Sequence, residues 1–128
     1  MKALIINPAM NLIAEYQFPD DPMKGANELQ EIVGGYIERA FVWPVEKAKN
    51  SKWYPNSRED ILWCNEEGLY KFRDAFFIEG IHQWVPGPAI ILGYKYNEEK
   101  NCDCTMSLDE LASKIRFGRL PGNIEEQE

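Results

Sequence analysis

The strongest strand signal in the chain is the segment AIILGYKY, residues 89–96. Its unbroken apolar run, Ile90-Ile91-Leu92, is typical of a strand buried on both faces, and it therefore predicts a central position in a sheet. The preceding VPGP, residues 85–88, predicts a rigid bend. Shorter apolar segments predict the other strands, which we expect at residues 2–7, 12–18, 36–43 and 60–65.

Two short helices are expected to pack on this sheet. In the first, residues 27–33, apolar side chains recur at helical spacing, and Gly34-Gly35 follows as a stop signal. The second begins at Ser107, which forms a capping box with Glu110 three residues later. We expect Gly118 to end this second helix.

Several connecting segments lack a clear period. Residues 19–22 and 45–60 predict loops, and Pro44 is expected to close the strand at 36–43. Residues 69–81 are apolar and aromatic, and they fit either a short helix or two short strands.

Together these elements predict an α+β fold, a mainly antiparallel sheet with two short helices on one face. We expect one domain over residues 1–120 and an acidic, flexible tail over residues 121–128. The strands expected at 2–7 and 36–43 offer edges at which two copies of the chain could pair into a homo-oligomer.

The charge balance excludes some classes of partner. The chain has 128 residues, and its 14 Lys+Arg against 21 Asp+Glu give 14 − 21 = −7. Such a balance opposes general binding to the phosphates of a long nucleic acid. No apolar run is long enough to span a membrane, and the N-terminal apolar run is too short for a secretory signal. We therefore expect a cytoplasmic protein with neither a membrane nor a long nucleic acid as its partner.

Cysteine usage is typical of a reducing compartment. Cys64, Cys102 and Cys104 are an odd number of thiols, which argues against a disulfide framework. With the single His82 they match a Cys3His zinc set in composition, but the C-x-C spacing of Cys102 and Cys104 is unfavourable for zinc. We expect no metal and no cofactor.

The chain contains no nucleotide-binding loop and no hydrolase signature. We therefore expect a protein that is not an enzyme. A small hydrolase stays an alternative, either through Cys64 with His82 or through the paired carboxylates Glu66 and Glu67.

Aromatic and basic residues are concentrated in the middle of this acidic chain. They are Trp43, Trp53, Tyr54 and Trp63, together with Lys47, Lys49, Lys52 and Arg58. Aromatic rings stack on bases and cations pair with phosphates, so this combination indicates a pocket for a small polar or nucleotide-like ligand. The alternative is that Trp43 and Trp63 are core residues and that the lysines solubilise a loop.

The acidic composition supports a second functional class. Small acidic proteins can imitate the charge of DNA and occupy the basic groove of a nuclease or methyltransferase, which would make this chain an inhibitor of a host protein. The alternative is that the net charge of −7 only keeps a small domain soluble.

Four sequence blocks, in this order, resemble a family of small domains of uncharacterised function found in phages, mobile elements and their bacterial hosts. They are MKALIINP (1–8), LQEIVGGYIE (29–38), NEEG (65–68) and GPAIILG (87–93). The resemblance implies a phage or mobile-element origin and a place in the cytoplasm of a bacterial host, and it implies no enzyme activity. This chain departs from the family in a longer segment before Asn65, and in the aromatic residues 72–77 where the family is often polar.

These blocks contain more polar residues than tight turns require. We expect the additional polar side chains to line a shared pocket. The complete predicted ligand site combines them with the aromatic and basic candidates: Tyr36, Glu38, Lys52, Trp53, Tyr54, Asn65, Glu67 and Arg73. Trp53 and Tyr54 would stack on the ligand, Lys52 and Arg73 would supply charge, and Asn65 and Glu67 would form directional hydrogen bonds. The expected function is sequestration of a ligand, such as a signal of host defence. A host defence protein is the alternative partner.

Overall fold

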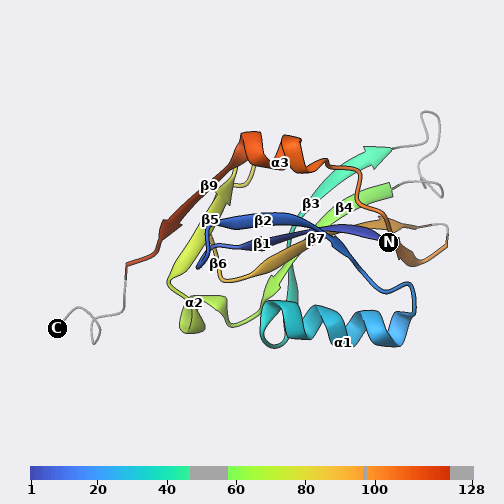
Figure 1. Ribbon diagram of the computed structural model, residues 1–128, viewed down its shortest axis with the longest axis horizontal. Coiled ribbons are helices and arrows are strands. Elements are labelled where there is room, and N and C mark those ends of the chain that lie inside the picture. Colours follow the sequence, from blue (N-terminus) through green and yellow to red (C-terminus); the bar gives the residue numbers. More distant parts are fainter. Residues whose placement is uncertain (47–57, 97, 122–128) are drawn as a thin grey trace.

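A computed structural model describes residues 1–46, 58–96 and 98–121 of the protein (Figure 1). Its strands are β1 (Lys2–Asn7), β2 (Leu12–Gln17), β3 (Ile37–Glu46), β4 (Arg58–Asn65), β5 (Asp74–Ile78), β6 (Val85–Pro86), β7 (Ala89–Lys95), β8 (Lys100–Cys102) and β9 (Ile115–Arg119). Its helices are α1 (Pro22–Val33), α2 (Gly68–Lys71) and α3 (Leu108–Lys114). The predicted α+β class with antiparallel sheets is therefore confirmed. The predicted residues Lys52, Trp53 and Tyr54 and the acidic tail from Gly122 lie outside the described residues.

The larger sheet has β7 at its centre, as the apolar run at 90–92 predicts. The strand order is β2-β1-β7-β4-β3 with β8 paired to β7, and every pair is antiparallel. Ile90, Ile91 and Leu92 are fully buried. Since β1 lies between β2 and β7, the predicted edge at residues 2–7 is wrong, whereas β3 does lie at an edge.

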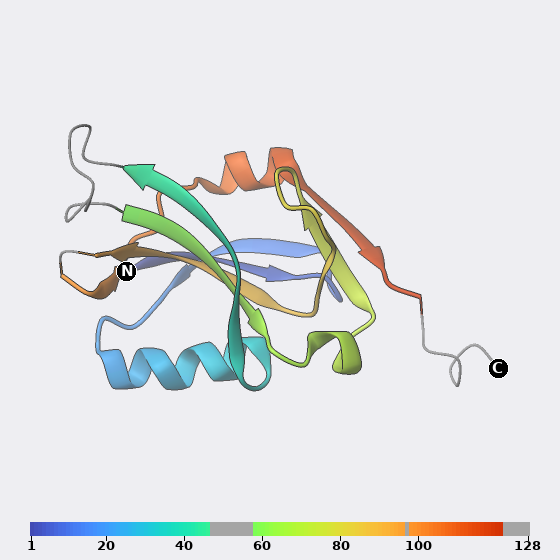
Figure 2. The ribbon, with the colours of Figure 1, turned by 180° about the vertical axis from the view of Figure 1, so that it is seen from behind.

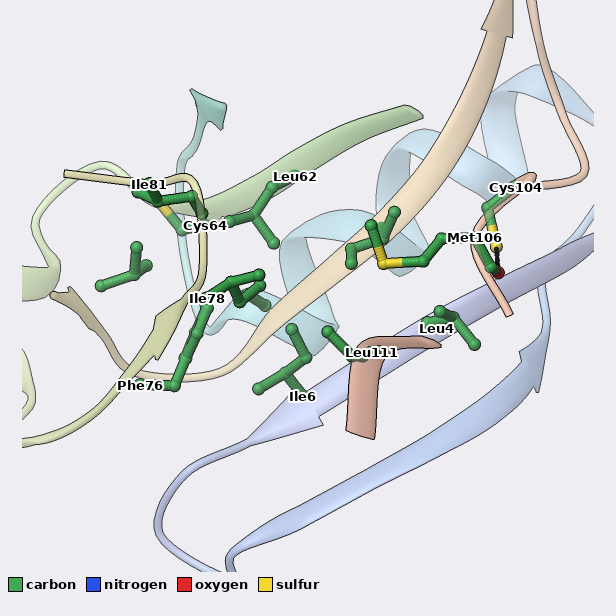
Figure 3. Close-up of a cluster of buried hydrophobic side chains, with 13 residues drawn as sticks. Leu4, Ile6, Leu62, Cys64, Phe76, Ile78, Ile81, Cys104, Met106 and Leu111 are labelled. Carbon is green, nitrogen blue, oxygen red and sulfur yellow. Dashed lines mark hydrogen bonds between the residues drawn. The ribbon is translucent and has the colours of Figure 1, made fainter. Parts of the chain in front are cut away.

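The two faces of this sheet have different covers. Leu29 of α1 packs against Ile90 on one face. On the other face, Leu111 of α3 and Phe76 of β5 pack in one cluster with Leu4 (Figure 3). The prediction that both helices lie on one face is wrong, because the central strands bury both faces and each face needs its own apolar cover. Figure 2 shows α1 and α3 on opposite sides of the sheet.

A second, three-stranded sheet completes the cover over the α3 face. Its order is β6-β5-β9. Residues 69–81, which the sequence left open between helix and strand, begin as α2 and continue as β5. Gly118 does not end a helix as predicted. It lies inside β9, because the chain leaves α3 at Lys114 and pairs immediately with β5.

Two boundaries differ from the sequence prediction for local reasons. Helix α1 begins at Pro22, not at residue 27, because the Asp21 side chain caps it by accepting hydrogen bonds from the Met23 and Lys24 backbone N–H groups. Strand β3 continues through Pro44 to Glu46. An edge strand tolerates proline, since one side of its backbone has no ladder to complete.

Candidate functional site

The turns of the four sequence blocks meet at one end of the larger sheet. Strands β1 and β4 end there, while β3 and β7 begin there, as the pairings Ile6↔Ala89 and Ile37↔Asn65 show. The β1–β2 turn, α2 and the smaller sheet lie at this same end of the molecule (Figures 1 and 2).

Asn65 connects two elements at this end instead of facing a ligand. Its side chain is 2% exposed. The amide Nδ2 donates a hydrogen bond to the Val33 carbonyl (3.0 Å), and Oδ1 accepts one from the Glu67 N–H (2.8 Å). Asn65 therefore has a structural role, and its predicted hydrogen bond to a ligand stays a prediction.

Gly34-Gly35 ends α1, as the stop signal in the sequence predicts, and leaves room for the Asn65 side chain. Gly34 ends α1 with φ of 81°, a left-handed conformation that favours glycine. At Gly35, a Cβ atom would lie 3.0 Å from Asn65 Nδ2, so any side chain there would crowd the amide. The two glycine positions thus let the chain reverse tightly from α1 into β3.

The largest hollow at this end, which we call the end cleft, has a volume of about 840 Å³. It is lined by residues 7–9 of the β1–β2 turn, residues 69–74 of α2 and the start of β5, residues 87–88 before β7, and residues 119–121 after β9. Two of the four blocks, residues 1–8 and 87–93, contribute to its wall. The other two blocks, residues 29–38 and 65–68, are joined to each other through the Asn65 side chain.

Phe72 forms part of this wall by packing directly on Gly87. A Cβ atom at Gly87 would lie 2.4 Å from Phe72 Cδ2, and Gly87 has φ of +84°. Backbone hydrogen bonds hold the neighbouring segments: the Gly87 N–H donates to the Asp74 carbonyl (2.9 Å) and the Leu120 N–H donates to the Arg73 carbonyl (2.7 Å). The wall is therefore set by main-chain contacts between segments distant in sequence.

The end cleft concentrates positive charge in an acidic chain. Within the part of the chain that the structure describes, Lys71, Arg73 and Arg119 line it, against one carboxylate, that of Asp74. Arg119 Nε lies 3.3 Å from Asp74 Oδ1, and both side chains are more than a third exposed. An exposed ion pair of this kind contributes little to stability, so Arg119 can exchange Asp74 for an anionic ligand at small cost.

A smaller side pocket of about 330 Å³ lies across α2 from the end cleft. It is lined by residues 38–40, 64–66, 68–69 and 83–86. Within it the Cys64 thiol donates to Glu38 Oε1 at 3.9 Å. Burial, and then the Glu38 carboxylate, raise the pKa of the Cys64 thiol to about 12. The raised pKa favours the neutral thiol at physiological pH, a form that is a poor nucleophile.

The other candidate metal-ligating and nucleophilic side chains do not form a cluster among the described residues. Among the described residues, no three His, Cys, Asp or Glu side chains lie close enough to hold a metal ion. Cys102 and Cys104 are free and buried, and the Cys104 thiol donates to the Met106 carbonyl (3.5 Å). His82 is exposed and lines neither hollow.

The predicted ligand residues do not gather in one pocket. Arg73 lines the end cleft, while Glu38 and Asn65 line the side pocket. The exposed Tyr36 and Glu67 line neither hollow. The five described members of the predicted site are therefore divided between the two hollows and the open surface.

Trp43 and Trp63 take the alternative role that the sequence offered, because both are partly buried and pack against the two core clusters. Sequence reasoning missed Lys71 and Phe72, although they adjoin Arg73 and could have been found with it. It also missed Arg119, for which no local signal exists, since only the pairing Asp74↔Arg119 brings it to the cleft.

Comparison with family models, curated proteins and solved structures finds no match to this chain. The resemblance of the four blocks therefore stays a prediction. Within the described residues, no helix has both the length and the apolar character needed to cross a bilayer.

Proposed function

We propose that this protein binds a small anionic ligand with an apolar or planar part in the end cleft. The observation that supports this proposal is that Lys71, Arg73 and Arg119 converge on one cleft in a chain of net charge −7. The described lining of the cleft holds one carboxylate, that of Asp74, against these three cations, so the local excess of positive charge favours an anion at this place.

The size and wall of the cleft favour a nucleotide-like ligand. Ligand pockets usually measure about 300–1,000 Å³, and the end cleft of about 840 Å³ lies in this range. Arginine side chains match phosphate oxygens with paired N–H donors. The Phe72 ring, together with Pro8 and Pro88, offers apolar surface for a base or another flat group.

Binding without turnover is the better proposal for this site. Four side chains are offered by the sequence for hydrolysis, and none lines the end cleft: Cys64, His82, Glu66 and Glu67. The cleft carboxylate, Asp74, is paired with Arg119. On the resemblance of the four blocks, we further propose that the protein acts in the cytoplasm of a bacterial host and sequesters a signal of host defence.

Isothermal titration calorimetry with a panel of nucleoside monophosphates, cyclic nucleotides and inorganic phosphate tests the proposal. We expect at least one phosphate-bearing ligand to bind, and Arg73→Gln or Arg119→Gln to weaken its binding at least tenfold. Arg116→Gln is the matched control, because Arg116 is an exposed arginine of the same strand as Arg119 and does not line the cleft. Equal loss in all three variants, or no binding by any member of the panel, would refute the proposal.

A further inference from the structure

The chain continues directly from the wall of the end cleft into an acidic stretch of sequence. Residues 119–121 line the cleft. The Leu120 N–H donates to the Arg73 carbonyl (2.7 Å), which holds this stretch beside the start of β5. Residues 122–128, which we call the acidic segment, follow immediately in the sequence. Their point of attachment is therefore the cleft wall itself.

The composition of the acidic segment complements that of the cleft. Its sequence is GNIEEQE, with three glutamates and neither lysine nor arginine. The described lining of the cleft carries three cationic side chains and one carboxylate, together with apolar surface that includes the Phe72 ring. Ile124 beside Glu125 and Glu126 offers an apolar group next to anionic ones, which is the combination that we propose for the ligand.

The acidic segment is long enough to reach back into the cleft. An extended chain covers at most about 3.6 Å per residue, so Glu125, four residues after Pro121, can lie up to about 14 Å from it. A group tethered by so short a stretch of chain competes like a free molecule at about millimolar concentration. Contacts that would be too weak between separate molecules are therefore sufficient to keep the segment in the cleft.

We propose that the acidic segment occupies the end cleft while no ligand is bound, and that a ligand must displace it. This regulation rests on the proposed function, because it concerns the same cationic site. The occupant belongs to the charge class that the cleft favours, and the chain itself holds it at the site. The apparent affinity for the ligand is then reduced in proportion to the fraction of molecules whose cleft is open.

Carbodiimide crosslinking of the full chain tests this occupancy without any ligand. The reagent joins a carboxylate to an amine when the two are in contact, and Lys71 is the one lysine among the described residues that line the cleft. We expect mass spectrometry to find an amide bond between Lys71 and a glutamate of the acidic segment. Mixing unlabelled chains with nitrogen-15-labelled chains distinguishes a bond within one chain from a bond between two copies.

The cations that adjoin Lys71 provide a matched pair of variants. Arg73→Gln/Arg119→Gln is expected to lower the yield of this crosslink at least fivefold. Arg116→Gln/Lys100→Gln removes two exposed cations that do not line the cleft, and it should leave the yield unchanged. Circular dichroism checks that both variants fold. The proposal is overturned by equal yields in both variants, by crosslinks only between copies, or by no crosslink at Lys71.

Neutralising the acidic segment measures its effect on the ligand. In calorimetry with inorganic phosphate and the nucleoside monophosphates, Glu125→Gln/Glu126→Gln is expected to tighten binding at least threefold. Glu79→Gln/Asp109→Asn removes two exposed carboxylates outside the cleft and should leave binding unchanged. Equal affinities in the two variants would overturn the regulation. If no probe binds, the proposed function fails, and the crosslink alone then decides whether the acidic segment occupies the cleft.

Discussion

The Asn65 side-chain amide donates to the Val33 carbonyl at a distance of 3.0 Å, and this hydrogen bond joins the last turn of α1 to the end of β4. The same side chain accepts from the Glu67 N–H. Val33 and Asn65 belong to the blocks 29–38 and 65–68 and lie 32 residues apart in the sequence. One buried amide thereby connects the two blocks. The polar character of Asn65, which the sequence associates with a ligand, has a structural explanation.

Asn65→Ala tests this structural role. The substitution leaves the Val33 carbonyl and the Glu67 N–H without their partner, and a buried group left unpaired costs about 1–3 kcal/mol. We expect the free energy of unfolding to fall by about 2 kcal/mol in urea denaturation. Asn27→Ala is the control, since Asn27 is exposed on α1. An unchanged stability together with a lost ligand affinity would instead restore Asn65 to the ligand site.

Gly87→Ala tests the wall of the end cleft. The new Cβ would meet the Phe72 ring at 2.4 Å, and the backbone has φ of +84°. Gly80→Ala separates these two effects, because Gly80 has φ of +100° and nothing within 4 Å of its Cβ position. We expect Gly80→Ala to cost about 1–2 kcal/mol from backbone conformation alone. Gly87→Ala should cost about 1–3 kcal/mol more through overpacking.

Both glycine variants are measured by urea denaturation and by calorimetry with the phosphate-bearing ligand. Gly87→Ala should also weaken ligand binding, because Phe72 must move, whereas Gly80→Ala should not. Equal destabilisation by the two substitutions would show that the close contact between Phe72 and Gly87 has no energetic weight.

We expect the buried Asp60 carboxyl to make the free energy of unfolding depend on pH. This buried carboxylate accepts hydrogen bonds from the Thr105 and Met106 N–H groups, each at 2.8 Å. Burial raises the pKa of the Asp60 carboxyl, and this effect outweighs the two hydrogen bonds, which lower it. The folded protein therefore holds the proton more tightly than the unfolded chain does. The stability that this proton contributes is complete below the unfolded pKa and is lost as the pH rises through the folded pKa.

Urea denaturation of the natural protein and of Asp60→Asn between about pH 3 and pH 7 measures this effect. We expect the free energy of unfolding of the natural protein, relative to Asp60→Asn, to fall with rising pH and then to level off. A relative stability that rises with pH would mean that the hydrogen bonds from Thr105 and Met106 lower the pKa of Asp60 in the folded state. The exposed Asp109→Asn controls for the loss of a carboxylate at the surface.

Cys64 is expected to be unreactive in the folded protein. Since burial and the Glu38 carboxylate raise the pKa of its thiol to about 12, almost none of it is thiolate at pH 8. Alkylation with iodoacetamide at pH 8, followed by mass spectrometry, should label Cys64 only after denaturation. Cys104, whose pKa burial also raises to about 12, serves as the internal comparison. Rapid labelling of Cys64 in the native protein would return it to consideration as a nucleophile.

Much of the fold follows from local patterns. Apolar runs place the strands of the larger sheet, and the burial of residues 90–92 on both faces predicts that β7 is central. Ser107 caps α3 by accepting from the Glu110 N–H at 3.0 Å, as its capping box predicts. These features are readable because side-chain periodicity and capping depend on residues within a few positions of one another.

The candidate site was much less predictable, and Arg73 and Phe72 show why. Arg73 was predicted as a charged ligand contact, but Arg119, which lines the same cleft, ends β9, and the sequence assigns most of β9 to a helix that Gly118 stops. Phe72 is one of several aromatic residues in an apolar segment, and nothing local distinguishes it as the one that packs on Gly87. The meeting of Arg73 with Arg119 in one cleft and the packing of Phe72 on Gly87 both depend on which strands pair. Strand pairing is decided by long-range burial.

Local chemistry in the chain was thus sufficient for β1, β2, β3, β4 and β7, for the end of α1 at Gly34-Gly35, for the cap of α3 and for the acidic character of the protein. Long-range packing alone decided that α1 and α3 cover opposite faces, that Asn65 supports a helix end, and that Arg73 and Arg119 share one cleft. The physical reason is that helix and strand signals arise from neighbouring residues, whereas a site forms where distant segments bury apolar surface against each other.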